Sequence, residues 1–526
     1  MIKINDIKIK INYSLNDLKK IVCEKLKINK NIIKNILIYK QSIDARKKIN
    51  IHYVLTVLVE VLDKNVQQKF EDFKPDYFGL DYKKVTSKTR PVIVGFGPSG
   101  MFAGLCLAKM GLKPIIIEQG EKVDKRIQSV EQFWKEGKLN KFSNVQFGEG
   151  GAGTFSDGKL NTNLNNSYCK KVINELYLHG APNQILYESK PHIGSDKLTQ
   201  VVKNIREDIL NLGGEILFNT KLTNVSVINN RLEKIELTNV LTNEQSYLQT
   251  DYLILCLGHS ARDTFKLLYD NNLEIKQKPF AMGVRIEQKS EIVNQMQYGK
   301  NYDKNLPNAD YKLVTHLPNG RSMFTFCMCP GGVVVASSSN DGEIVTNGMS
   351  YFARDNKYSN SALLINVNPS DYQSDDPLAG IYFQQKYERL AYELGGGNFC
   401  APVQTVGSFL NNKENSSKCS YGPGYKFTNL KGCLPDFVYE NLKLGLKDFN
   451  KKYKNFAQDY DVLIGVETRS SCPLTIVRDE NFESNIKGIY PCGEGAGYAG
   501  GIVSSAQDGI KVCESIYKNL GGKLWF

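Results

Sequence analysis

The sequence predicts an α/β fold, in which a Rossmann-like dinucleotide-binding domain with a β-meander carries an inserted mixed α+β domain and follows a small N-terminal α/β domain. Three observations predict this fold: a GxGxxG motif after a short apolar strand, a glycine-rich loop after the next strand and helix, and a Gly-Glu-Gly segment before the last helix. The expected boundaries are 1–75 for the N-terminal domain, 76–90 for a linker, 91–270 and 456–526 for the dinucleotide-binding domain, and 271–455 for the inserted substrate or cap domain.

The N-terminal domain begins with residues that alternate between polar and apolar. The pattern predicts a strand over residues 2–12, a helix over 14–26 with Ser14 as its N-cap, and a long strand over 51–62. A basic turn is expected at residues 40–48. These lengths indicate a domain of ferredoxin-like size.

The dinucleotide-binding domain begins with an apolar run at residues 92–94, which is typical of a buried parallel strand. In the GxGxxG motif that follows, the first glycine permits a tight turn, the second lets the backbone approach a pyrophosphate, and the third lets the helix pack against the strand. The start of the helix adds unpaired N–H groups and the positive end of its dipole. The residues expected to bind a cofactor here are Gly95, Gly97, Pro98, Ser99 and Gly100.

A carboxylate follows the second strand. Residues 114–117 form the apolar run, and Glu118 comes 18 residues beyond Gly100. At this position a carboxylate accepts hydrogen bonds from ribose hydroxyls and would repel a 2′-phosphate. The complete unit of strand, turn, helix, strand and acid therefore predicts that the chain binds FAD or NAD.

The loop at residues 147–163 contains five glycines. So many glycines in a short loop mean that the backbone approaches another group closely or turns sharply. The loop is either a flexible surface segment or a segment that lies against a cofactor, and its place after the second strand and helix favours the second. The loop residues expected to contact the cofactor are Gly150, Gly151, Gly153 and Thr154.

The next segments return the chain to the sheet. We expect a helix over residues 196–212, a strand over 215–219 and a β-meander over 221–250. A further apolar run at residues 253–257 ends at Gly258. Ligands bind at the carboxyl edge of such a sheet, so Gly258 joins the expected cofactor site.

Near the C-terminus, a short strand runs into a Gly-Glu-Gly segment, further glycines and a helix. This arrangement directs helix N–H groups toward a phosphate or ribityl group. One dinucleotide motif, a meander and this distant clamp favour FAD over NAD, and they leave room for NAD(P)H as a transient electron donor. The residues expected to contact FAD here are Gly493, Glu494, Gly500, Gly501 and Ile502.

The combination of motifs resembles the glutathione-reductase-type flavoprotein superfamily, and within it a family of FAD-dependent dehydrogenase-like proteins (NAD(FAD)-utilising dehydrogenases) found in bacteria and plastids. The segments that carry this narrower resemblance are residues 148–162, 190–198, 280–287, 324–332, 346–355 and 466–473. The resemblance covers nearly the whole chain. It implies FAD as the cofactor, and it implies that Gly150, Gly151 and Gly153 lie against the flavin.

The candidates for catalysis are polar groups expected near the flavin. Cys327 and Cys329 form a CxC pair, and residues two apart on a strand share a face, so both thiols could reach one site; alternatively, they pack at a strand end. Arg469 could hold an anionic substrate or stabilise the charge of a reduced flavin, with Glu467 beside it; alternatively, the two belong to ordinary ion pairs. No metal site is expected, because the CxC pair lacks further ligands at a recognisable spacing.

The composition of the 526 residues, 41% hydrophobic and 23% charged, is ordinary for a globular protein. No apolar run approaches the ~20 residues of a membrane span, and no signal peptide is visible, so a cytoplasmic location without disulfides is expected. The net charge of +12 favours a solvated basic surface; the alternative is an anionic partner such as a nicotinamide dinucleotide, RNA or a membrane surface.

The expected function is that of an FAD-dependent oxidoreductase, a dehydrogenase or reductase, acting on a small organic molecule. One alternative is an FAD-dependent tRNA-modifying enzyme, which the basic charge motivates, although no basic patch interleaved with aromatic residues is visible. Another is a non-catalytic flavin sensor or scaffold whose N-terminal domain recruits a partner. The sequence makes no prediction of the oligomeric state.

Overall fold

The protein is described by a computed structural model covering residues 1–74, 78–160, 166–413 and 416–524. Residues 76–77 of the predicted linker and 161–163 of the predicted glycine-rich loop lie outside this part of the chain. None of the helices in the described part has the length and apolar composition needed to cross a membrane.

A parallel sheet forms the centre of the nucleotide-binding half. Its strands are β4 (Val92–Val94), β5 (Ile115–Ile117), β6 (Glu215–Leu217), β10 (Leu253–Leu255) and β22 (Ile489–Pro491). They lie in the order β22-β10-β4-β5-β6, all parallel. Every residue of β4, β5, β10 and β22 is buried, as expected for apolar strands covered on both faces. The predicted α/β class with a parallel sheet is confirmed.

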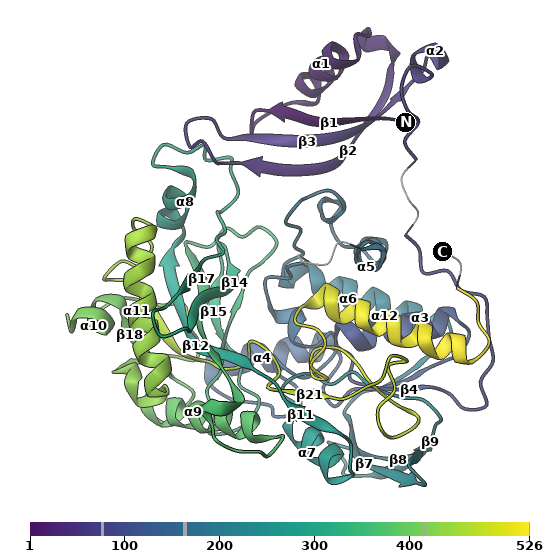
Figure 1. Cartoon of the computed structure of the whole chain (residues 1–526), viewed down its shortest axis with the longest axis vertical. Helices are drawn as coiled ribbons and strands as arrows, with labels where there is room; N and C mark the ends of the chain where they lie inside the picture. Colours follow the sequence, from purple (N-terminus) through teal and green to yellow (C-terminus); the bar gives the residue numbers. More distant parts are fainter. Residues whose placement is uncertain (75–77, 161–165, 414–415, 525–526) are drawn as a thin grey trace.

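Helices cover one face of this sheet (Figure 1). They are α3 (Pro98–Lys109), α5 (Ser167–Leu178), α6 (Ser195–Asn211) and α12 (Ile502–Asn519). Ile93, Ile116 and Ile254 of the sheet join their apolar core. α12 packs so closely along α3 that a Cβ added at Gly509 would lie 2.4 Å from the Ser99 carbonyl oxygen. Another helix, α4 (Val123–Glu136), follows β5.

The meander covers the opposite face. It consists of β7 (Thr220–Ile228), β8 (Arg231–Asn239) and β9 (Gln245–Gln249), all antiparallel. α7 (Arg262–Asp270) and the pair β11 (Ile275–Gln277) and β21 (Leu474–Ile476) complete this layer. Val92, Val94 and Leu255 point away from the helices and join an apolar core between the sheet and the meander, as the alternation of side chains along a strand requires. The predicted meander and the return of the chain through β10 are confirmed.

A second, seven-stranded sheet lies beside the first (Figure 1). Its strands, in spatial order, are β13 (Val314–His316), β14 (Ser322–Cys329), β17 (Tyr358–Val367), β12 (Phe280–Lys289), β20 (Val462–Glu467), β18 (Ala401–Thr405) and β19 (Tyr425–Phe427). Around it lie α8 (Ser290–Tyr298), α9 (Ala379–Gly395), α10 (Val406–Asn411), α11 (Asp436–Lys452) and the hairpin β15 (Val333–Ala336) and β16 (Thr346–Met349). Short 3₁₀ helices occur at Lys30–Ile32, Ala152–Phe155, Asn183–Leu186, Pro369–Asp371 and Leu430–Cys433.

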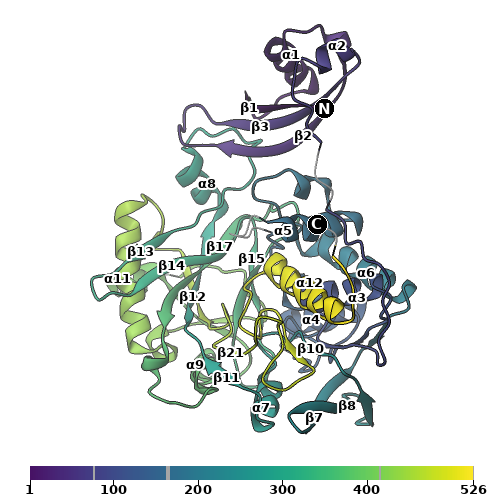
Figure 2. The ribbon, with the colours of Figure 1, turned by 45° about the vertical axis from the view of Figure 1, so that its right-hand side comes forward.

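The N-terminal unit is a three-stranded antiparallel sheet of β1 (Ile2–Ile9), β3 (His52–Val61) and β2 (Ile33–Asp44), with the helices α1 (Leu15–Leu26) and α2 (Lys64–Gln67). Ser14 caps α1 as predicted. The basic turn predicted at residues 40–48 is wrong in part, because β2 continues to Asp44 as the pairing partner of β3. Figure 2 shows this unit above α8, where Lys48 Nζ donates to the Met296 carbonyl at 2.8 Å. The Gln41 N–H also donates to the Tyr187 carbonyl, which follows the 3₁₀ helix Asn183–Leu186, at 2.8 Å.

Candidate cofactor site

A cavity of about 980 Å³ lies at the carboxyl ends of the central parallel strands and reaches β14 and β20 of the second sheet. Most of the predicted site residues line it. These are Gly95, Gly97, Pro98, Ser99, Glu118, Gly151, Gly153, Gly258, Cys327, Glu467, Arg469, Glu494, Gly500, Gly501 and Ile502. The remaining five, Gly100, Gly150, Thr154, Cys329 and Gly493, do not line it.

The GxGxxG turn is packed too tightly for side chains. Gly95 has φ +101°, and a Cβ there would lie 2.4 Å from the Cys256 carbonyl oxygen. A Cβ at Gly100 would lie only 1.9 Å from the Gly95 carbonyl oxygen. Gly97 is the N-cap of α3 and faces the Gly151 Cα across the cavity wall. The start of α3 is therefore open toward the cavity, where its N–H groups and dipole favour an anion.

Glu118 fastens three backbone segments. Its Oε2 accepts the Phe96 N–H at 2.9 Å, and its Oε1 accepts the N–H groups of Gly120 and Gly148, each at 2.9 Å. Its carboxylate therefore joins the glycine turn, the end of β5 and the glycine-rich loop. A carboxylate has about four lone-pair sites, so three backbone bonds leave capacity for one more donor from the cavity.

The glycine-rich loop lies across the start of α3. Gly151 has φ +65°, and a Cβ there would lie 2.8 Å from the Gly97 Cα. Buried Arg126 of α4 holds the preceding turn in place by donating to the backbone carbonyls of Asn144, Val145, Gly148 and Glu149. The sequence did not indicate this arginine, since it occupies one turn of an ordinary amphipathic helix.

The C-terminal clamp, residues 493–502, lies beside the start of α3. Gly493 has φ +81°, and a Cβ there would lie 2.7 Å from the Ser99 Oγ. Its N–H donates to Asp508 Oδ2 at 2.8 Å, while Glu494 Oε2 accepts the His259 N–H at 2.9 Å. Gly501 is the N-cap of α12, so a second helix begins at the cavity.

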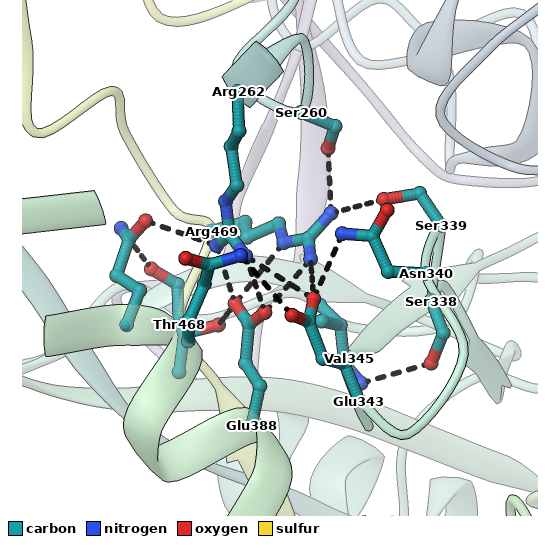
Figure 3. Close-up of polar contacts among 12 residues, drawn as sticks. Ser260, Arg262, Ser338, Ser339, Asn340, Glu343, Val345, Glu388, Thr468 and Arg469 are labelled. Carbon is teal, nitrogen blue, oxygen red and sulfur yellow. Dashed lines mark hydrogen bonds and ion pairs between the residues drawn. The ribbon is translucent and has the colours of Figure 1, made fainter. Parts of the chain in front are cut away.

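Arg469 lies in a buried ion-pair cluster (Figure 3). Its Nε and Nη2 donate to Glu388 at 3.1 and 2.8 Å, and Nη2 also donates to Glu343 at 3.2 Å. Its Nη1 donates to the hydroxyls of Ser260 and Ser339 at 2.8 and 2.6 Å. All five N–H groups of this guanidinium therefore have acceptors, so the cluster leaves no donor of Arg469 for the anionic substrate that the sequence suggested.

Glu388 is the centre of this cluster. Arg262 also binds this carboxylate, through two hydrogen bonds of 2.8 Å each, from Nη1 and Nη2. Burial disfavours the charged carboxylate, but the charges of Arg262 and Arg469 outweigh burial and hold the pKa of Glu388 well below its usual range. Burial raises the pKa of Glu343. The partners come from α7, α9 and the segments after β15 and β20, so the cluster ties the two halves of the cavity wall together.

Glu467 forms a second buried ion pair. Arg285 of β12 donates to its carboxylate through Nε at 2.6 Å and Nη2 at 3.0 Å. Arg285 Nη1 also donates to the Cys327 carbonyl at 3.3 Å and to Asn360 at 2.7 Å. Glu467 and Arg469 therefore pair with different partners rather than with each other. Both line the cavity.

Comparison with known protein families gives two matches. Residues 279–470 match the model described as "FAD-dependent protein, C-terminal domain-like". Residues 1–60 match a domain of unknown function (DUF8436). The first match supports FAD as the cofactor and gives no support to NAD(P)H.

Solved structures show a distant likeness. The FAD complex of glycerol-3-phosphate dehydrogenase from Bacillus halodurans is 9% identical, with a TM-score of 0.38 over 83% of this chain and 65% of that one. A flavoprotein/dehydrogenase from Cytophaga hutchinsonii (8% identical) and a geranylgeranyl bacteriochlorophyll reductase-like protein from Thermoplasma acidophilum (12% identical) both have TM-scores of 0.35, over 83% of this chain and 80% of theirs. Scores this low add nothing to the fold described above.

One curated relative is much nearer. An uncharacterized protein of Clostridium beijerinckii is 47% identical over 532 residues, which cover 98% of each chain. The chain belongs to the same protein family as this clostridial protein.

Proposed function

We propose that the protein is an FAD-dependent oxidoreductase that transfers hydride or electrons between a bound flavin and a small organic substrate. The observation that carries the proposal is one continuous cavity. It joins a glycine cradle at the starts of two helices to a wall of charged and sulfur side chains from the second sheet. The family match of residues 279–470 to FAD-dependent proteins supports the choice of cofactor.

The residues present fit FAD. Where Gly95 and Gly151 line the cavity, a Cβ would collide with backbone, so this part of the wall is bare backbone that a pyrophosphate can approach. Gly100, behind this wall, lets α3 pack against the Gly95 carbonyl. Glu118 offers its remaining acceptor capacity to a ribose hydroxyl. The starts of α3 and α12 offer N–H groups to phosphate and ribityl oxygens.

FAD supplies the hydride or electron transfer when it is bound, and the chain supplies position and electrostatics. Glu118 holds the glycine turn and the glycine-rich loop at a fixed spacing through its three backbone bonds. The Arg469 cluster fixes the opposite wall, and in this role Arg469 and Glu467 act as positioning residues. We assign residues 91–270 and the chain after β20 to the FAD-binding domain. We assign residues 271–455 to the cap domain together with β20, which pairs with β12 and β18 of the second sheet. Neither the tRNA-modifying alternative nor the scaffold alternative is favoured by the family match.

Anaerobic reduction of the flavin tests this proposal. The purified protein should show a flavin spectrum, and a panel of NADH, NADPH and small metabolites should contain a donor that bleaches it. A matched pair of variants separates the site from general damage. Gly100→Ala should lose the flavin, while Gly432→Ala should keep it, since its Cβ would meet only the Leu394 side chain at 3.3 Å. A folded protein that stays colourless with added FAD would overturn the proposal.

A further inference from the structure

Two cysteines meet at one place in the cavity wall. The pairing of β14 with β17 shifts register between Phe326 and Cys329, so this end of the strand is a bulge. Cys327 occupies the bulge with φ +43°, is partly exposed and lines the cavity. Cys329 is fully buried, and its Sγ donates to the Cys327 carbonyl oxygen at 3.3 Å. Cys327 thus borders the cavity, and the Cys329 sulfur lies within hydrogen-bond distance of the Cys327 backbone.

The charges around the pair favour a thiolate at the open position. The side-chain hydrogen bond from Cys329 lowers the pKa of Cys327 against the effect of burial, and Lys159 and Arg285 lower it further. The same contact raises the pKa of Cys329. Ordinary buried cysteines of this chain behave in the opposite way, because burial alone raises the pKa of Cys433 to about 12. Both shifts have the direction that favours the proton on the inner sulfur and the thiolate at Cys327.

We propose that Cys327 and Cys329 form a redox-active dithiol–disulfide pair, which exchanges two electrons with the flavin and gives the site thiol or disulfide compounds as its class of substrate. The inference rests on the proposed function, because it needs FAD in the cavity that Cys327 lines together with Gly97 and Gly151. The asymmetry of the pair fits this chemistry, in which an accessible thiolate attacks and a protected thiol resolves.

The step balances as follows in the reducing direction. The Cys327 thiolate attacks one sulfur of a substrate disulfide and the S–S bond of the substrate breaks. The first substrate thiolate leaves and takes a proton from water, equal to the proton that Cys327 released on ionising. Cys329 then loses its proton and attacks the Cys327 sulfur, which releases the second substrate thiol and forms the Cys327–Cys329 disulfide. Two electrons and two protons from reduced FAD restore both thiols, and an organic hydride donor reduces the flavin again.

Counting electrons tests the inference without an assay of turnover. The flavin-loaded protein is oxidised with diamide, desalted and titrated anaerobically with dithionite. The wild type should take up about four electrons per FAD, two for the flavin and two for the disulfide. Cys329→Ser should take up about two, and the matched control Cys23→Ser on α1 should take up about four, as the wild type does. Uptake of two electrons by the wild type, or of four by Cys329→Ser, would overturn the inference.

A second measurement needs no variant. Trypsin releases residues 322–354 as one peptide that holds both cysteines. In the oxidised protein both should resist alkylation under denaturing conditions, and after dithionite both should be alkylated. Free thiols in the oxidised protein would overturn the inference while the flavin spectrum stays intact. A protein that binds no FAD would instead overturn the proposed function.

Discussion

Replacing Glu118 by glutamine tests whether this carboxylate holds the cofactor cradle together. The change keeps the shape of the side chain but turns one acceptor oxygen into an NH₂ donor. In the structure, the two oxygens accept three backbone N–H groups, from Phe96, Gly120 and Gly148. If the amide oxygen takes the place of Oε1, it keeps the hydrogen bonds from Gly120 and Gly148. The Phe96 N–H then faces the NH₂ group, which is also a donor.

An N–H group left unpaired in the interior costs about 1–3 kcal/mol. Local opening of these loops should therefore become about 5- to 150-fold more frequent in Glu118→Gln. Hydrogen exchange followed by mass spectrometry should show this acceleration in peptides that contain Phe96, Gly120 or Gly148. Glu131→Gln serves as the control, because its ion pair with Lys135 is exposed and contributes little. Unchanged exchange at all three amides in Glu118→Gln would refute the clamp role.

Three further predictions concern the cradle, the ion-pair cluster and pH. Gly100→Ala should abolish FAD binding in a fluorescence titration, since its Cβ would lie 1.9 Å from the Gly95 carbonyl oxygen, and tight binding would contradict this packing. Arg469→Met should lower the free energy of unfolding by about 3–5 kcal/mol in urea, because Glu388 loses one of its two arginines; a loss below about 1 kcal/mol would contradict the buried cluster. Burial raises the pKa of Glu287 to about 7, so its protonated form stabilises the fold at low pH and this contribution is lost as pH rises from about 4.5 to 7. Over that interval the free energy of unfolding should therefore fall by about 3 kcal/mol less in Glu287→Gln than in the wild type. Parallel pH profiles of the two proteins would contradict the raised pKa of Glu287.

The glycine cradle was predictable because its requirements act on the backbone itself. Where an added Cβ would lie 2.4 Å or less from a carbonyl oxygen, only glycine fits, and so Gly95 and Gly100 form a recognisable sequence pattern. The short buried strands and the meander were equally visible, since their apolar periodicity follows directly from burial on one or two faces. The acid at Glu118 was found by its distance from the motif, although its three backbone partners were not.

The second sheet was less predictable for a physical reason. Its central strand β12 is buried along nearly its whole length yet contains Arg285 and Glu287, which in a sequence indicate exposure. Both are satisfied by partners far away in the chain: Glu467 for Arg285, and Ser420 for Glu287. The Arg469 cluster has the same character, because Arg262, Glu343 and Glu388 lie 81 to 207 positions away along the sequence. Such contacts depend on topology, which local patterns do not encode.

The central claim is that the cavity between the two sheets binds FAD. The most direct measurement is the flavin content of the folded protein, determined by releasing and identifying the cofactor after saturation with FAD and removal of the excess. The account predicts about one FAD per wild-type chain and none for Gly100→Ala. A folded wild-type protein that retains no FAD, or a Gly100→Ala protein that retains as much as the wild type, would contradict it.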